Sequence, residues 1–264
     1  LDSIGAIDYD YASIFYRQGV SKSHEVSVVG GNDKTKFYLS TAYFDQEGID
    51  LGSSLKRYTL RFNLDHTINK LSFQLSSTIG YSKSKIAEGE LLGNSARNPF
   101  QMTYRAKTYE NPYNKDGSLN FGSSTNLALK QVANLMEGIQ NSSRGIDQIK
   151  ANASAVVAYK LFPTVTLKNN LGLDVGSSYN NRYIKPNSYI GQLQTFNAGL
   201  TQEAYGLRSD FINTLSALYN EKFGKHEVES GLYYEIVRGY QRGLGFTLYN
   251  IDPRLSETGQ GAGT

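Results

Sequence analysis

The sequence contains no cysteine, so it offers neither a disulfide framework nor a thiolate metal site. It also contains no run that approaches the roughly 18 consecutive apolar residues of a membrane-spanning helix. Its mean hydropathy of -0.44 still permits membrane strands, because a barrel strand needs apolar residues only at alternate positions. The net charge of +3 is too small to indicate nucleic-acid binding.

Motifs of catalysis and metal binding are equally scarce. HExxH, GxSxG and P-loop patterns do not occur, and no acidic pair has a spacing that calls for acid–base chemistry. The stretch 114–117 (NKDG) resembles part of a calcium loop but lacks the remaining ligands, so it predicts a turn. We therefore expect a protein that is not an enzyme and that carries no cofactor or metal.

The chain does contain strongly two-faced segments, of which 55–66 is the clearest. Read with period 2, this segment separates into a polar side and a largely apolar side. The polar side holds Leu55, Arg57, Thr59, Arg61, Asn63 and Asp65, and the other holds Lys56, Tyr58, Leu60, Phe62, Leu64 and His66. Such a segment suits a soluble sheet with a wet face, or a membrane barrel with a wet lumen.

Similar alternation recurs in 71–82, 149–161, 165–175 and 227–236, whereas 36–44 and 207–221 are ambiguous. Short connections (30–34, 67–70, 162–163, 223–225) alternate with long polar ones (45–54, 83–148, 177–206 and from 242 onward). Long strands with short turns at one rim and long loops at the other are typical of outer-membrane barrels. We predict an all-β, antiparallel transmembrane barrel with about eight strands between His24 and Tyr240.

Three interpretations remain open from the residues alone. The strands form part of a wider barrel, or a small complete barrel, or a soluble β-sheet module that binds carbohydrate or serves a structural role. The chain begins with Leu1, and its last residues, 257–264 (ETGQGAGT), resemble the middle of a loop. We therefore expect a segment of a larger protein, which favours the wider barrel.

Two groups of residues are candidates for binding. Aromatic and cationic side chains in the longest connection suit sugar or peptide recognition or contact with a partner, although they also suit packing of the loop onto itself. These loop candidates are Phe100, Tyr104, Arg105, Tyr109 and Tyr113. On the polar side of the clearest strand, the candidates that face a lumen or a plug are Arg57, Arg61 and Asn63.

Several stretches, in this order and spacing, resemble the SusC/RagA-like TonB-dependent outer-membrane transporters of Bacteroidetes. The resemblance extends from about Asp8 to His226. It depends on 27–31 (SVVGG) with 34–38 (KTKFY), 42–49 (AYFDQEGI), 56–58 (KRY) with 61–65 (RFNLD), 112–118 (PYNKDGS), and 213–214 with 222–226. Relatives often carry Trp after an Asp upstream of the first strand, where this chain has tyrosines at Tyr9 and Tyr11.

The resemblance implies that residues 1–264 form part of a plugged barrel of about 22 strands, with the plug and the C-terminal strands outside the chain. It further implies active import of large nutrients across the outer membrane, with oligosaccharides as the first expectation and oligopeptides as the second. A SusD-like surface lipoprotein would cover the loops, and the TonB–ExbB–ExbD system would supply energy through the plug. The transporter–lipoprotein pairs would form a dimer, surrounded by outer-membrane lipid.

Overall fold

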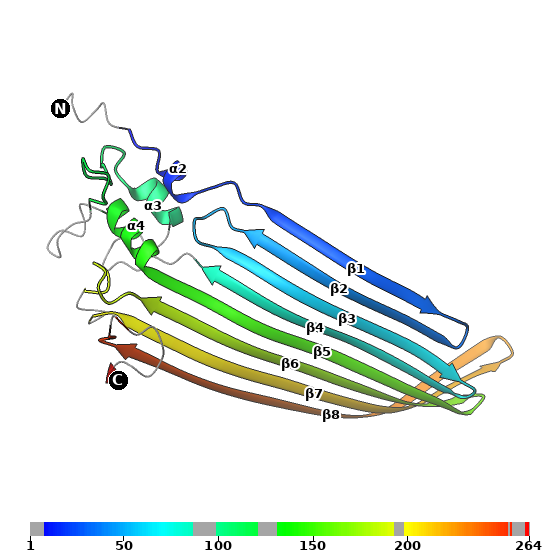
Figure 1. Cartoon of the computed structure of the whole chain (residues 1–264). Coiled ribbons are helices and arrows are strands. Elements are labelled where there is room, and N and C mark those ends of the chain that lie inside the picture. Colours follow the sequence, from blue (N-terminus) through cyan, green and yellow to red (C-terminus); the bar gives the residue numbers. More distant parts are fainter. Residues whose placement is uncertain are drawn as a thin grey trace.

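The computed structural model describes residues 8–86, 99–120, 131–192, 198–252, 254 and 262–263. The strands form one antiparallel sheet in which each strand pairs with its neighbours in sequence. They are β1 (Ser21–Gly31), β2 (Thr35–Glu47), β3 (Ser54–Ile68), β4 (Leu71–Ile86), β5 (Ser142–Phe162), β6 (Val165–Ile184), β7 (Leu200–Phe223), β8 (His226–Tyr249) and β9 (Ala262–Gly263). Figure 1 shows a broad, curved wall with the helices gathered at one end.

The predicted all-β antiparallel fold is confirmed, including the sorting of the connections. Two or three residues join β1 to β2, β3 to β4, β5 to β6 and β7 to β8 at one rim, which we call the turn end. The other connections emerge at the opposite rim, the loop end (Figure 1). The wall stays open, because within the described residues β1 pairs with β2 alone and β9 with β8 alone. The interpretation as a small complete barrel is therefore not realised.

Several boundaries predicted from alternation were wrong, because the strands continue further toward the loop end. β4 extends to Ile86, β6 to Ile184 and β8 to Tyr249, all within stretches that we had assigned to loops. There the side chains are polar on both faces, as in Tyr179–Arg182, while the ladder to β7 continues. Backbone pairing in a wet environment needs no apolar alternation, so the pattern that located the strands fades before they end. Of the Gly-rich stretch 257–264, all but 262–263 lies outside the described residues.

Strand register gathers most of the large apolar side chains of β1–β8 on one face, the apolar face. Leu60 stands opposite Thr41 and Ile79, and Ile79 is opposite Ala151. The alternation in 207–221 of β7 was ambiguous in the sequence, and strand pairing decides it: Phe211 lies opposite Leu173 and belongs to the apolar face. Other members are Val26, Val28, Phe37, Leu39, Phe62, Leu64, Leu71, Phe73, Leu75, Ile149, Val157, Leu167, Leu171, Leu207, Leu215 and Leu232.

This apolar face lies open on the outside of the sheet. Leu60 is 45% exposed, Val28 55% and Leu232 76%. An exposed surface that is apolar over most of eight long strands, interrupted by Asn169, Asn213 and Arg238, is far larger than a soluble sheet leaves in water, which argues against the soluble module. Along β3 the apolar band runs from Tyr58 to His66, about 27 Å at 3.4 Å per residue. At a strand tilt of about 35–45°, that length spans roughly 19–22 Å along the membrane normal, close to the band of about 25 Å that a barrel presents to lipid.

A row of tyrosines closes this band toward the loop end. The ring centroids of Tyr43 and Tyr58 are 5.0 Å apart, and those of Tyr58 and Tyr81 are 6.3 Å apart. Aromatic girdles of this kind mark the membrane–water boundary of barrels. No helix in the described part of the chain is long and apolar enough to cross a membrane.

A compact helical cluster at the loop end contains a separate hydrophobic core. It is built from α2 (Tyr11–Phe15), α3 (Pro99–Arg105) and α4 (Gln131–Asn141). The start of α2 is fixed by Asp10, whose Oδ1 accepts hydrogen bonds from the N–H groups of Ala12 and Ser13. The buried side chains are Tyr11, Phe15, Met102, Val132 and Leu135.

Candidate functional site

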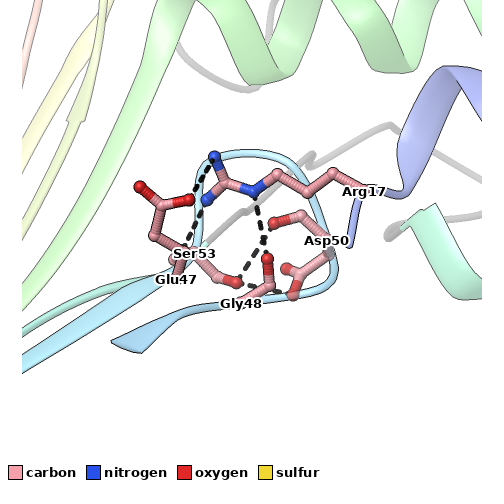
Figure 2. Close-up of polar contacts among 5 residues, drawn as sticks. All are labelled: Arg17, Glu47, Gly48, Asp50 and Ser53. Carbon is pink, nitrogen blue, oxygen red and sulfur yellow. Dashed lines mark hydrogen bonds and ion pairs between the residues drawn. The ribbon is translucent and has the colours of Figure 1, made fainter. Parts of the chain in front are cut away.

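At the loop end, Arg17 lies at the centre of a network of polar contacts with the β2–β3 connection (Figure 2). The Arg17 guanidinium donates through Nε to the carbonyl of Gly48 at 3.1 Å and through Nη2 to that of Ser53 at 3.3 Å. Its Nη1 lies 3.6 Å from Glu47 Oε2. One planar side chain thus holds both ends of the β2–β3 connection, which suits the forked geometry of arginine.

The Glu47–Gly48 pair of the DQEG motif has a local explanation. A Cβ on Gly48 would lie 1.8 Å from Ser53 Oγ and 3.0 Å from Ser53 Cβ, so a side chain here would displace the Ser53 hydroxyl. Ser53 Oγ instead donates to Asp50 Oδ1 at 2.6 Å. The motif therefore forms the tight loop whose carbonyls accept hydrogen bonds from Arg17.

Replacing Arg17 is expected to loosen this loop. Arg17→Ala removes the charged donor from two carbonyls, at a cost of about 1.5–3 kcal/mol of local stability. Arg17→Lys keeps the charge but loses the fork, so it should recover only part of that stability. Hydrogen exchange of the amides of Gly48 to Ser53, followed by mass spectrometry, measures the effect. Arg61→Ala, in the middle of β3, should leave these amides unchanged, and equal protection in all variants would contradict this role.

Tyr11 ties the N-terminal segment to the longest connection. Its hydroxyl donates to the carbonyls of Lys107 at 2.6 Å and Glu110 at 2.7 Å. Burial, followed by the nearby charge of Glu110, raises the pKa of Tyr11 to about 12, so the phenol stays protonated. Tyr11 is thus a core residue of the helical cluster.

Glu137 joins two loops that are distant in sequence. Its carboxylate accepts hydrogen bonds from the backbone N–H of Tyr189 at 2.8 Å and of Ile190 at 3.2 Å. Asn141 Nδ2 also donates to it at 3.0 Å. Burial raises the pKa of Glu137, against the opposing effect of these donors. The buried acid therefore positions the β6–β7 connection against α4.

The structure brings two of the predicted loop residues together. Phe100 and Tyr104 meet edge to face on α3, with centroids 5.6 Å apart, and are 68% and 67% exposed. With Tyr16, Ile49 and neighbouring residues they line an open hollow of ≈ 560 Å³. Two exposed rings beside a hollow offer a stacking surface for a flat ligand or for an apolar side chain.

The other three loop candidates lie apart from this pair. Tyr109 stands beneath Lys107, whose Nζ is 5.9 Å from the ring centroid. Tyr113 forms an isolated bridge with Leu119, at the base of the turn formed by 114–117. That turn closes by a hydrogen bond from Gly117 N–H to the Asn114 carbonyl, as predicted, and Arg105 ends α3. Within the described residues there is no group of three or more side chains suited to hold a metal.

The three strand candidates share the polar face of β3. Arg57 lies opposite Phe44 and Ser82, and Arg61 opposite Ser40 and Thr78. Both arginines are exposed, while Asn63 accepts a hydrogen bond from Ser76 at 2.8 Å. Their contact with a lumen or a plug stays a prediction.

Arg17 and Glu137 are residues that hold the loop end together and that sequence reasoning missed. Neither belongs to an alternating segment or to a catalytic motif, and both act through backbone groups of another loop. For Arg17 the available signal was a single charge shortly after the helix start at Asp10, and for Glu137 it was a single charge within a helical pattern. Both signals are weak.

Comparisons of sequence and of structure with known proteins point to the same kind of protein. No protein-family model matches the chain. The chain is 25% identical over 230 residues to TonB-dependent receptor P3 of Formosa agariphila, covering 85% of this chain and 22% of that protein. It is 22% identical over 272 residues to TonB-dependent receptor SusC of Bacteroides thetaiotaomicron, covering 95% and 26%. The chain thus spans about a quarter of the length of these relatives.

Among solved structures, the RagAB peptide transporter superposes with a TM-score of 0.77 at 19% identity, over 97% of this chain and 28% of that one. The same assembly in its open-open state gives 0.73. The antiparallel wall of this chain, with one apolar and one polar face, thus has the fold of a segment of an outer-membrane β-barrel. The resemblance seen in the motifs is confirmed: over most of its length the chain is similar to a segment of TonB-dependent receptors, SusC among them, and to a segment of the RagAB transporter.

Proposed function

We propose that the protein imports large nutrients across the outer membrane, with the apolar face in lipid and the polar face lining the path of the cargo or the plug. The observation that carries this proposal is the two-faced wall itself, which separates apolar from polar side chains across eight strands. The non-enzymatic names of the relatives, receptor and transporter, agree with it.

The cargo in this proposal is an oligosaccharide, with an oligopeptide as the second candidate. The exposed rings of Phe100 and Tyr104 support both, because rings stack on sugar faces and also pack against peptide side chains. The peptide transporter among the structural neighbours is the reason for keeping the oligopeptide as a candidate. A SusD-like lipoprotein at the loop end, and TonB–ExbB–ExbD acting through a plug outside this chain, complete the proposed system.

Uptake by cells that carry the full-length gene tests this function. Deletion should abolish growth on the oligomeric nutrient and leave growth on its monomer intact. Phe100→Ala with Tyr104→Ala should weaken capture of the cargo about tenfold, the effect of losing roughly 1.4 kcal/mol of stacking. The measurement is uptake of labelled oligosaccharide and labelled oligopeptide at several concentrations.

Tyr109→Ala is the matched control, since it removes an exposed ring that lies apart from the hollow. It should leave uptake within about twofold, well under 1 kcal/mol. Growth of the deletion strain on oligomers at the wild-type rate would contradict the transport proposal. Loss of peptide uptake alone would replace the first cargo candidate by the second.

A further inference from the structure

A row of charged side chains lies on the apolar face just beyond the tyrosine row. Lys56 of β3 stands directly opposite Lys83 of β4. Asp45 on β2 flanks Lys56, and Asp147 on β5 flanks Lys83, so the row reads Asp–Lys–Lys–Asp across four strands. It lies two residues, about 7 Å, past Tyr58 along the strand.

The flanking carboxylates neutralise the two lysines only weakly. Lys56 Nζ lies 3.9 Å from Asp45 Oδ2, and Lys83 Nζ lies 3.8 Å from Asp147 Oδ2, with both lysine side chains more than half exposed. The same oxygen of Asp45 also accepts a hydrogen bond from the hydroxyl of Tyr43 at 2.9 Å. Like charges that face each other across two strands repel, so an anion between the two ammonium groups would relieve a local strain.

Further cations surround the same place. Lys56 and Lys83 line an open hollow of ≈ 490 Å³ together with Arg17 and Lys85. The lining contains four cationic side chains against the carboxylates of Asp45 and Glu47, and Asp147 beside Lys83 is a third carboxylate, which leaves an excess of one positive charge. The hydroxyl-bearing residues Ser53 and Ser54 complete it. The hollow therefore favours an anion with several acceptor oxygens, such as a phosphate group.

The position of the hollow selects the kind of molecule that carries the phosphate. Below it lie the tyrosine row and then Leu60 and Ile79, which face the hydrocarbon region. The aromatic girdle marks the level of the headgroups, and lysines beside it extend their ammonium groups to that level. An occupant with acyl chains along the apolar face and a phosphate above the tyrosines fits both surfaces at once.

We propose that the hollow between Lys56 and Lys83 binds the phosphate of a phosphorylated lipid of the outer leaflet. Lys85 and Arg17 supply additional positive charge, and the acyl chains lie over Tyr58 and Leu60. Such a lipid would fix the loop end of β2–β4, and the Arg17 loop above it, relative to the membrane surface. The site is independent of the cargo, because it lies on the apolar face.

Titration of the purified full-length protein in neutral detergent, followed by thermophoresis, tests the proposal. The three probes are bisphosphorylated lipid A, the same lipid without phosphate, and inorganic phosphate. Lys56→Gln with Lys83→Gln should weaken binding of the phosphorylated lipid about 30-fold, because each substitution removes one charged contact with the phosphate. Lys34→Gln with Lys70→Gln, which removes two charges at the turn end, should change it by less than about twofold.

Wild-type protein should bind the phosphorylated lipid much more tightly than the lipid without phosphate, and this comparison decides the matter even if the double variant fails to assemble. Equal binding of both lipids, or an unchanged affinity in Lys56→Gln with Lys83→Gln, would overturn the proposal. Inorganic phosphate that binds as tightly as the lipid would assign the hollow to a soluble anion and would overturn the lipid as well.

Discussion

Leu60→Arg is expected to block assembly of the barrel. Leu60 lies in the middle of the apolar band, opposite Thr41 and Ile79, and its side chain is 45% exposed. An arginine near the midplane of the bilayer costs about 2–4 kcal/mol. The measurement is the amount of full-length protein in outer-membrane fractions that shows a heat-modifiable shift on gels.

The adjacent residue provides a matched control. Thr59 points to the polar face, between Ala42 and Gly80, where an arginine has space and water. Thr59→Arg should therefore assemble at close to the wild-type level. If Leu60→Arg and Thr59→Arg assembled equally well, the assignment of the two faces would be wrong.

Phe15→Ala is expected to destabilise the helical cluster at the loop end by about 3–5 kcal/mol, the usual cost of deleting a buried ring. Phe15 is 2% exposed and packs with Tyr11, Met102, Val132 and Leu135. The β-wall should still form, because its strands make their own hydrogen bonds. Hydrogen exchange of α2, α3 and α4, read by mass spectrometry against that of β3, separates the two parts.

Phe100→Ala is the control for this substitution, because it deletes the same ring at a site that is 68% exposed. Its effect on exchange of the cluster should stay within about 0.5 kcal/mol. Fast exchange of β3 in Phe15→Ala would contradict the view that cluster and wall are separate cooperative units.

The strands inside the apolar band were predictable because lipid and lumen impose opposite chemistry on alternate residues. The alternation in 55–66 located β3, which spans Ser54–Ile68. Toward the loop end this constraint disappears, so the extension of β6 to Ile184 and the start of β7 at Leu200 left no pattern. The helices α3 and α4 were missed for a related reason, since within the described residues much of their buried surface packs on each other and on α2.

The binding residues were only partly predictable. Composition singled out Phe100 and Tyr104, and the fold brings them into contact, but nothing in their spacing separated them from Tyr109 and Tyr113. Arg17 donates hydrogen bonds to carbonyls of the β2–β3 loop, which is distant in sequence. Lys56 and Lys83 lie opposite each other because of the register between β3 and β4. Contacts between distant segments follow from pairing, which a single strand pattern does not contain.

Probe accessibility along β3 tests the central claim, that one face of the wall meets lipid and the other meets water. Residues 1–264 contain no cysteine, so single cysteines at positions 58–66 accept a spin label at one site each once any cysteine elsewhere in the full-length protein is replaced by serine. In the reconstituted full-length protein, collisions with oxygen should peak at Leu60, Phe62 and Leu64. Collisions with a water-soluble nickel complex should peak at Thr59, Arg61 and Asn63. Two profiles that rise and fall together, or that show no period of two, would contradict the account.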